Sequence, residues 1–517
     1  MVLKCLTVNG TTFYWYKERI LNRILKFIGF ALFALAVIAA AQTPETHYVS
    51  KNGDNSDGKS WATAWTDMDR IQWGIVRPGD TILIDGGAVA CPVLGDEVPG
   101  CGQIYNRQLS IGQNNVTIRG VGGTVIIDGN QTNFTYCSEN GVVSPPRSPN
   151  GPVLETVVSF GGRSGVTIEN IHVRNGKTYG INFGGGDNNS VKNVSVHNIN
   201  NPADTTNNSV GITMGHTADN IRITRAEIYR NGQDAIRGTA DNLTVEDSYI
   251  HDHYCNHPDG IQAFVPTSNG DVGTSEQVIE NMVIQRNVFE RVGLQQVFLG
   301  ENATHQSWVN GLVIRDNLFI GCSYCIKTKH QNSTNFVIEN NTFYGSSQFA
   351  IEWCCGAGFG ARAPMVIRNN IFHNTRNPSG TGFYLPTSGT TTFSGNCLSG
   401  RVGGRVGNIT ESGNVTGNVL FSNVSGGNYA LSPVSPCAGK GSSITSKDML
   451  FVQTATPTPT FTVEPTATET LVPSETPTET PEPTATEAPT FTPSPVVVIL
   501  DCRVTLSNGV PVAIECP

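Results

Sequence analysis

The chain has 517 residues, of which 38% are hydrophobic and only 15% are charged, with 56 glycines and a formal net charge of −9. A sequence this low in charge and this rich in Gly, Asn, Thr and Val favours β-strands with many turns over helices. It has no basic stripe of the kind that nucleic-acid-binding proteins use, so that class is excluded.

Residues 1–41 are predicted to be a signal peptide or an N-terminal anchor. Five basic residues precede an apolar run over residues 27–41, which ends in the small residues Ala39 and Ala41. This order is typical of an export signal. A retained anchor is the alternative, although the run is shorter than the roughly 20 apolar residues that a spanning helix needs. We therefore expect a secreted or cell-surface protein.

The cysteine count supports export. One of the 13 cysteines precedes the apolar run, which leaves an even number in the rest of the chain, as expected where disulfides persist. Sequence spacing suggests the disulfides Cys91–Cys101, Cys397–Cys437 and Cys502–Cys516. A further group consists of Cys322, Cys325, Cys354 and Cys355. These cysteines could form disulfides, which export favours, or a four-thiolate zinc site.

Residues 42–112 are predicted to form an N-terminal cap with the first strands. We expect a short amphipathic helix at residues 61–76, a turn at residues 78–80 and a buried strand at residues 81–84. Such a cap would cover the strand edges that the open end of a repeat leaves unpaired.

Residues 113–445 contain a repeat that predicts an all-β solenoid. Most repeats span roughly 22–32 residues, and each holds a strand with alternating apolar residues, a polar corner and a second strand. Two columns recur at matching places in four repeats, one of Asn287, Asn317, Asn341 and Asn370, and one of Phe289, Phe319, Phe343 and Phe372. Asparagines stacked at a corner and phenylalanines stacked in a core explain both columns.

The end of the chain changes in composition. The coil is expected to end near residues 429–441, and residues 446–495 form a Thr/Pro/Glu-rich linker that predicts a disordered stalk. Residues 496–517 alternate in polarity around the turn at residues 507–509, which predicts a short disulfide-stapled hairpin. The stalk and hairpin suggest attachment to a cell envelope.

The densest group of proton-transferring side chains lies at residues 251–264. When the second strands of successive repeats are aligned, Asp234 and Asp259 fall on adjacent rungs, about 4.8 Å apart. Two carboxyls this close cannot ionise independently, so one pKa should rise, as a general acid requires. In this alignment the aspartate column holds Tyr179, Val210, Asp234, Asp259, Gln296, Tyr324 and Phe349, and an outward column holds Asn182, Thr213, Arg237, Gln262, Leu299, Lys327 and Glu352.

These columns predict a carbohydrate-binding wall that carries catalytic groups. The predicted catalytic residues are Asp259, Asp234, His257 and Lys327. The predicted substrate-binding residues are Arg237, Gln262, His253, Phe264, Glu301, Lys329 and Trp353. Aromatic faces suit sugar rings, and the wall is expected to include Phe264, Trp308, Tyr324 and Trp353. His251 and His253 have a spacing that suits a metal ion. As an alternative to a catalytic role, an aspartate before a glycine, such as Asp259, can be a turn former.

Residues 47–441 resemble right-handed parallel β-helix proteins of the pectate-lyase-like superfamily. The stretch HPDGIQAF is similar to the Asn-Thr-Asp-Gly-x-Asp motif of polygalacturonases, with Asp259 at the first aspartate. The next rung has Gln295 and Gln296 where that family has paired aspartates. The stretch KTKHQNSTNFVIENNTF is similar to a segment of alginate and chondroitin lyases, which implies a base role for Lys327 or Lys329.

Two functions follow as hypotheses. The first is an exported enzyme that cleaves an acidic polysaccharide, as a glycosidase with Asp259 as acid and Asp234 as its partner, or as a lyase. In the lyase, Lys327 or a loop histidine abstracts a proton, while Arg237 or a bound Ca²⁺ neutralises the substrate carboxylate. The second is a non-catalytic carbohydrate-binding or adhesive solenoid at the cell surface. In both cases we expect a monomer that binds polysaccharide and no nucleic acid, and no cofactor is certain.

Overall fold

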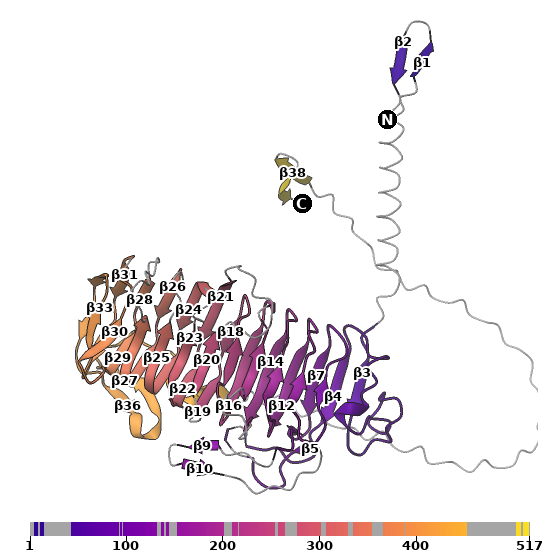
Figure 1. Ribbon diagram of the computed structural model, residues 1–517, viewed down its shortest axis with the longest axis horizontal. Coiled ribbons are helices and arrows are strands. Elements are labelled where there is room, and N and C mark those ends of the chain that lie inside the picture. The colour runs from indigo at the N-terminus through magenta and orange to yellow at the C-terminus, as the bar shows by residue number, and fades with distance from the viewer. Residues whose placement is uncertain are drawn as a thin grey trace, which may run out of the picture. The chain divides into compact units, whose positions relative to one another are not determined.

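In the computed structural model (Figure 1), the structure describes residues 43–131, 152–200, 209–253, 257–263, 277–300, 307–328, 334–353 and 365–451, except residues 93, 96, 216 and 388. Of the remaining chain it describes the antiparallel strand pairs β1 (Cys5–Val8) with β2 (Thr11–Tyr14), β9 (Tyr136–Ser138) with β10 (Gly141–Val143), and β38 (Arg503–Ser507) with β39 (Val510–Glu515). Residues 1–458 and 459–517 are separate units. Among the described residues, no helix is long and apolar enough to span a membrane.

The repeat forms a coil whose successive turns add strands to three parallel sheets. Sheet 1 consists of β3 (Thr46–Val49), β4 (Thr81–Asp85), β7 (Thr117–Val121), the first parts of β12 (Thr167–Arg174), β14 (Ser190–His197) and β16 (Arg222–Tyr229), and then β18 (Thr244–Glu246), β21 (Gln277–Gln285), β24 (Ser307–Arg315), β26 (Phe336–Glu339), β28 (Met365–Arg368), β31 (Thr391–Ser394) and β34 (Ile409–Ser412).

Sheets 2 and 3 complete each turn. Sheet 2 consists of β5 (Gln103–Tyr105), β8 (Val125–Asp128), the second parts of β12, β14 and β16, then β19 (Tyr249–His253), β22 (Val288–Val292), the first parts of β25 (Leu318–Thr328) and β27 (Thr342–Trp353), and β29 (Ile371–Thr375), β32 (Cys397–Ser399) and β35 (Val415–Thr416). Sheet 3 consists of β6 (Leu109–Ser110), β11 (Thr156–Ser159), β13 (Tyr179–Asn182), β15 (Val210–Met214), β17 (Ile236–Gly238), β20 (Asp259–Ala263), β23 (Gln295–Leu299), the second parts of β25 and β27, and β30 (Thr381–Tyr384) and β33 (Gly404–Val406).

In most turns of the coil, one residue with left-handed backbone joins sheet 1 to sheet 2. A second such residue, five positions later, ends sheet 2. Asn170 and Asn175 have φ values of 58° and 54°. The pattern recurs at Asn193 and Asn198, Arg225 and Arg230, Asp247 and Asp252, Arg286 and Arg291, and Asn369 and Asn374. Asparagine and aspartate reach this conformation at lower cost than most residues, which explains their frequency at the corners.

The predicted asparagine and phenylalanine columns are confirmed. The four asparagines are fully buried, and the backbone N–H of each donates to the Oδ1 of the next at 2.9–3.0 Å, a ladder that continues to Asn396 and Asn414. The four phenylalanine rings stack with centroids 4.8–4.9 Å apart. Both columns therefore hold successive rungs in one register.

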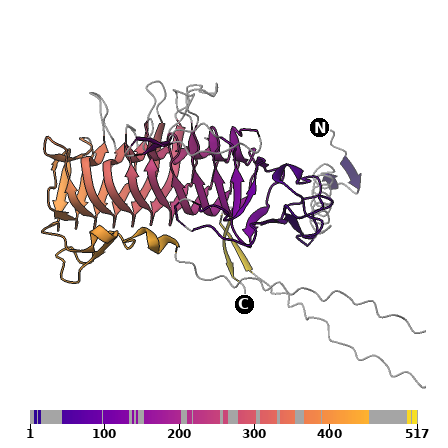
Figure 2. The same ribbon diagram turned by 90° about the horizontal axis from the view of Figure 1, so that it is seen from below.

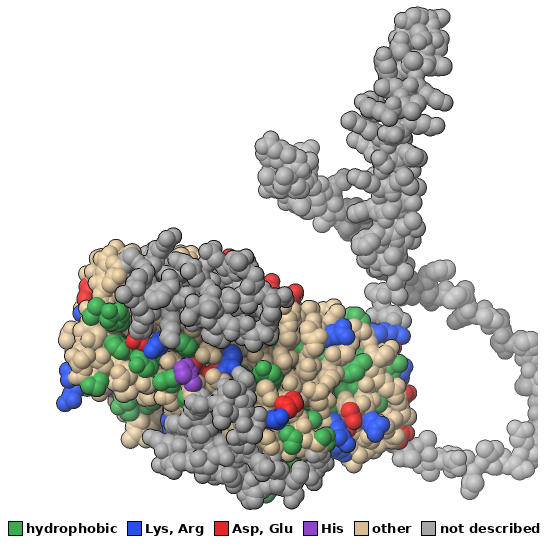
Figure 3. Space-filling model, viewed as in Figure 1, with side chains coloured by type: hydrophobic (Ala, Val, Ile, Leu, Met, Phe, Trp, Pro, Cys, Tyr) green, Lys and Arg blue, Asp and Glu red, His purple; other side chains and the backbone are tan. Residues whose placement is uncertain are grey.

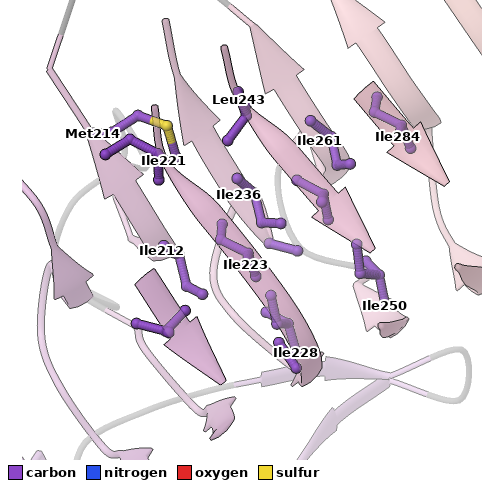
Figure 4. Packing of buried hydrophobic residues seen from close by; sticks show 14 of the residues in the cluster. Ile212, Met214, Ile221, Ile223, Ile228, Ile236, Leu243, Ile250, Ile261 and Ile284 are labelled. Atoms are coloured by element: carbon purple, nitrogen blue, oxygen red, sulfur yellow. The ribbon is translucent and has the colours of Figure 1, made fainter. Parts of the chain in front are cut away.

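The core is filled by aliphatic side chains from all three sheets. Figure 4 shows this packing for Ile212, Ile236 and Ile261 of sheet 3, Ile223 of sheet 1, and Ile228 and Ile250 of sheet 2. Each of these side chains is at most 1% exposed. Burial of one such side chain stabilises the fold by about 1.5–3 kcal/mol.

The N-terminal cap lacks the predicted helix. Within residues 61–76 the structure has one short 3-10 turn, η1 (Met68–Arg70). The fully buried Trp65 instead pairs with Val49 as an isolated parallel bridge, and its ring stacks on His47 with centroids 5.5 Å apart. The bridge to β3 thus places Trp65, which the sequence pattern assigned to a helix, whereas the strand predicted at residues 81–84 is confirmed as β4.

Sheet 2 is covered near its N-terminal end by the loop that the Cys91–Cys101 disulfide closes. Glu97 in this loop is buried, with its carboxylate 3.0 Å from Arg174 Nη1 and 3.0 Å from His197 Nε2. Burial would raise the pKa of Glu97, but its contacts with His197, His172 and Arg174 hold that pKa far below the ordinary value. The loop is therefore fixed to the coil by a buried polar cluster.

The segment predicted to close the coil instead runs back along sheet 2 (Figure 2). The last strand of the coil is β35. It is followed by the hairpin of β36 (Phe421–Asn423) and β37 (Asn428–Leu431), with η2 (Val424–Gly426) between them, and later by η3 (Lys447–Phe451). The N–H of Gly441 donates to the carbonyl of Asn369 at 2.8 Å, and Ser442 Oγ donates to the carbonyl of Asp316 at 2.6 Å. Leu450 packs in a cluster with Tyr249.

Two of the predicted disulfides, Cys91–Cys101 and Cys397–Cys437, are present, and Cys322 is joined to Cys325. Cys354, Cys355, Cys502 and Cys516 lie outside the described residues. The hairpin predicted near the C-terminus is present as β38 and β39.

We expect Asn317→Ala to destabilise the coil by about 3 kcal/mol. The backbone N–H and the Nδ2 of Asn287 both donate to Asn317 Oδ1, and an unsatisfied buried donor costs about 1–3 kcal/mol. Urea unfolding would measure the loss. Asn408→Ala, at an exposed position, is the control and should change the unfolding free energy by less than about 0.5 kcal/mol. Equal effects of the two substitutions would contradict the ladder's role.

Candidate active site

Sheet 3 presents two columns of side chains on its outer surface. The paired residues of the first, the Arg237 column, are Arg237, Gln262, Phe298, Lys327 and Glu352. Three positions earlier in each rung lies the second, the Asp259 column, with Asp234, Asp259, Gln295, Tyr324 and Phe349. We call the two columns together the sheet 3 wall. On the face shown in Figure 3, a histidine side chain lies beside acidic and basic side chains near the middle of the coil.

One rung of the predicted alignment is wrong by one residue. Gln295 rather than Gln296 pairs with Asp259, and Phe298 rather than Leu299 pairs with Gln262. Because Leu299 is fully buried in the core while Phe298 is apolar and on the wall, this strand has apolar residues on both faces. Alternation of polarity cannot fix the register of such a strand.

Asp234 and Asp259 lie on adjacent rungs, as predicted from the repeat. The backbone N–H of Asp259 donates to Asp234 Oδ1 at 3.3 Å, and both side chains are fully buried. Arg237 Nε donates to Asp234 Oδ2, and Gln262 Nε2 donates to Asp259 Oδ2 at 3.1 Å. Each carboxyl therefore has its own donor from the neighbouring column.

The environment of this pair keeps a proton at the site near neutral pH. Burial raises the pKa of Asp234 to about 7, a rise that the Arg237 guanidinium opposes and the neighbouring Asp259 increases. Burial also raises the pKa of Asp259, which the hydrogen bond with His257 opposes. The two carboxyls interact directly, so their proton belongs to the pair rather than to either residue.

His257 places a half-exposed imidazole over the buried pair. Its Nδ1 lies 3.4 Å from Asp259 Oδ2, and its side chain is 50% exposed. Its backbone is left-handed, with φ at 55°, a conformation that histidine adopts more often than most residues. The hydrogen bond with Asp259 raises the pKa of His257, and burial opposes the rise. Asp259 thus orients the ring and leaves Nε2 available.

The next charged pair on the wall lies two rungs further along. Lys327 Nζ lies 2.8 Å from Glu352 and 4.0 Å from the centroid of the Tyr324 ring. Phe298 stands between Gln262 and Lys327 in the Arg237 column, and its ring centroid is 6.2 Å from that of His257. The structure therefore brings Asp234, Asp259, Arg237, Gln262 and His257 together, whereas Lys327 is separate from them. Phe298 and Gln295 were not identified from the sequence, because of the register error.

Two predicted site histidines lie on sheet 2 instead of the wall. His251 contacts Asp252 at 2.7 Å and Glu227 at 3.2 Å, and His253 Nε2 lies 3.2 Å from the carbonyl oxygen of Ile228. Because Asp252 between them has left-handed backbone, the two rings do not share one face. Burial lowers the pKa of His253 to about 4. The contacts of both histidines are therefore with the coil itself, away from the wall on which they were predicted.

The other predicted wall residues have different outcomes. Trp353 is only 7% exposed and packs on Phe336 in the core, with ring centroids 5.1 Å apart, so it does not line the outer surface as expected. Phe264, Glu301 and Lys329 lie outside the described residues, as does the side chain of Trp308.

The described wall residues do not fit the Ca²⁺ ion that the sequence left open. Calcium needs several free oxygen ligands, but Asp234 accepts from Arg237, Asp259 accepts from Gln262, and Glu352 is paired with Lys327. Within the described residues, no group of three or more His, Cys, Asp or Glu side chains could hold a metal ion.

Comparison with known proteins addresses the fold. Residues 156–352 match the family model described as a right handed beta helix region. The coil is a right-handed parallel β-helix, which confirms the predicted fold class. No curated protein sequence matches the chain.

The chain is also similar to several solved structures. A complex of XylC with xylose has 9% identity over 73% of this chain and 87% of that chain, with a TM-score of 0.46. An alginate lyase from Paenibacillus sp. str. FPU-7 has 14% identity over 67% of this chain and 97% of that chain, with a TM-score of 0.42. A GH87 α-1,3-glucanase from Streptomyces thermodiastaticus strain HF3-3 has 14% identity over 73% and 71%, with a TM-score of 0.38. Similarity at these identities relates to the coil and carries no conclusion about the function of this chain.

We expect Asp259→Asn to reduce the pH dependence of stability. A carboxyl whose folded pKa is raised binds more protons in the folded than in the unfolded chain, so the stability it contributes falls as pH rises from about 4 to about 7. Removal of one carboxyl should make the variant more stable than wild type at pH 7, relative to pH 4, by on the order of 1 kcal/mol.

Urea unfolding at several pH values would test this expectation. Asp448→Asn, a change at an exposed aspartate, is the control and should follow the wild-type pH dependence. A wild-type pH dependence in Asp259→Asn would show that the two carboxyls do not share a proton.

Proposed function

We propose that the protein is an exported polysaccharide lyase that cleaves uronate-containing chains on the sheet 3 wall. One observation carries the proposal. His257 presents a half-exposed imidazole that Asp259 holds in place, and one rung away lies the guanidinium of Arg237, whose side chain is 18% exposed. A base and a guanidinium that can reach the carboxylate are the two groups that elimination from a uronate needs first.

The wall does not suit hydrolysis by two carboxyls. A glycosidase needs one carboxylic acid and one carboxylate that both reach the glycosidic bond. The side chains of Asp234 and Asp259 are 0% exposed, and that of Glu352 is 9% exposed and paired with Lys327. Of the described carboxyl and imidazole side chains on and beside the wall, His257 is therefore the exposed one.

In the proposed reaction, the partly exposed guanidinium of Arg237 donates to the uronate carboxylate and draws charge away from the adjacent carbon. Nε2 of His257 then takes the proton from that carbon, a C=C bond forms, and the bond to the leaving oxygen breaks. The imidazolium returns its proton to the leaving oxygen, so no external acid is consumed. Asp259 stabilises the imidazolium between the two proton transfers. Asp234, which accepts a hydrogen bond from Arg237 Nε, keeps the guanidinium in place.

We expect His257→Asn to lower turnover of an acidic polysaccharide by about 10²–10⁴-fold, the range of general acid–base catalysis. Asparagine adopts left-handed backbone readily, so the variant should fold while it lacks the imidazole. Turnover is measured by the ultraviolet absorbance of the unsaturated uronate product. His172→Asn, the same change at a histidine on sheet 2, is the control and should keep full activity.

Other outcomes of this assay would select other functions. New reducing ends without the ultraviolet signal would indicate a glycosidase. Binding of the polysaccharide with no product would favour the non-catalytic adhesive solenoid. Full activity of His257→Asn would remove His257 from the mechanism.

We expect kcat/KM to rise with pH through a pKa above the ordinary 6.5 of histidine. Only neutral His257 can accept a proton, and the hydrogen bond with Asp259 raises the pKa of His257. In Asp259→Asn this midpoint should move to lower pH, because the carboxyl that favours the imidazolium is gone. A midpoint that is the same in both proteins would separate Asp259 from the base.

A further inference from the structure

A shallow recess of about 500 Å³ opens on the coil beyond Phe349. Its lining consists of Ser347, Asn374, Arg376, Asn377, Pro378 and Arg401. Arg376 and Arg401 are exposed, and neither forms an ion pair with a described carboxylate. Many arginines elsewhere on the coil, such as Arg286 and Arg368, are paired with Asp or Glu. The recess thus concentrates positive charge that no described carboxylate neutralises.

The backbone around the two arginines is held by asparagine side chains. Asn374 Oδ1 accepts from the N–H of Arg401 at 2.9 Å. Asn377 Oδ1 accepts from the N–H of Thr381 at 2.8 Å, and the N–H of Asn377 donates to the carbonyl of Thr381 at 2.7 Å. Both arginines therefore extend from fixed corners, which reduces the entropy lost when they bind a ligand.

The recess lies on the same line as the proposed catalytic group. The turn at residues 377–380 leads into Thr381, which follows Phe349 in the register of the Asp259 column. Thr381 is four rungs from Asp259, roughly 19 Å along the coil axis. Between them lie Gln295 and the stacked rings of Tyr324 and Phe349, whose centroids are 5.9 Å apart. Aromatic and amide side chains of this kind suit the faces and hydroxyls of sugars.

We propose that the recess is a distal anion subsite for the polysaccharide. It binds a carboxylate or sulfate ester several sugar residues away from the cleaved bond, while the chain follows the coil axis over Tyr324 and Phe349. Arginine forms paired hydrogen bonds with both kinds of anionic group. The inference rests on the proposed function for the site at His257, and it adds that the substrate is a polyanion long enough to span both positions.

Binding to an inactive protein tests the subsite apart from catalysis. Affinities for a uronate disaccharide and a uronate octasaccharide are measured by calorimetry in the His257→Asn variant. Arg376→Gln and Arg401→Gln are added singly and together, and Arg163→Gln, at an exposed arginine distant in sequence, is the matched control.

We expect the double variant to bind the octasaccharide about tenfold more weakly, with a smaller dependence on salt. Binding of the disaccharide, which is too short to reach the recess, should not change, and Arg163→Gln should bind both as the parent does. An unchanged thermal unfolding midpoint of the double variant would show that the exposed substitutions leave the coil folded.

Each further result supports or overturns the subsite. An octasaccharide of otherwise neutral sugars carrying sulfate esters that binds more tightly than the uronate would assign the recess to sulfate, and weaker binding would assign it to carboxylate. Unchanged octasaccharide affinity in the double variant would overturn the inference even if the protein is a lyase. Weaker affinity without any lyase activity in the wild type would retain the subsite and reject the proposed function.

Discussion

The structure depends on one constraint, the in-register stacking of parallel rungs about 4.8 Å apart. Stacking of like residues is favourable where they complement themselves: Asn317 and its neighbours exchange hydrogen bonds, and Phe319 stacks between two rings. Stacking is unfavourable for Asp234 and Asp259, since two carboxyls face the same repulsion and the same burial. The stacking that stabilises the scaffold therefore brings two carboxyls that repel each other together at one place on sheet 3.

The neighbouring column compensates for this charge without removing it. Arg237 pairs with Asp234, Gln262 donates to Asp259, and His257 covers Asp259 from the solvent side. With both carboxyls ionised, Arg237 alone would leave one negative charge uncompensated, and a proton near neutral pH supplies the balance. Burial raises the pKa of Asp234, and the hydrogen bond with Asp259 raises that of His257, so both groups hold a proton more strongly than free side chains do. A group that gains and loses a proton at working pH is what general acid–base catalysis requires.

The repeat made most of this geometry predictable. The columns of Asn317 and Phe319, and the adjacency of Asp234 and Asp259, follow from counting residues between equivalent strands. The rung at residues 295–299 was placed wrongly because Phe298 is apolar on the outer surface, so the local pattern did not reveal the register. The return of residues 421–451 over sheet 2 has no periodic signal, since it depends on contacts such as Ser442 with Asp316. Local sequence patterns therefore predict the order of the strands well, but they predict poorly which segments pack over the sheets.

The three sheets differ in what they leave for a ligand. Sheet 1 carries paired charges, such as Arg119 with Glu169 and Arg368 with Glu339. Sheet 2 is covered by the loop that contains Glu97 and by the returning C-terminal segment. Arg237 and the two exposed recess arginines lie on or beside sheet 3. A ligand that contacted all three would be anionic at more than one point and extended along the coil axis, as we propose for an acidic polysaccharide.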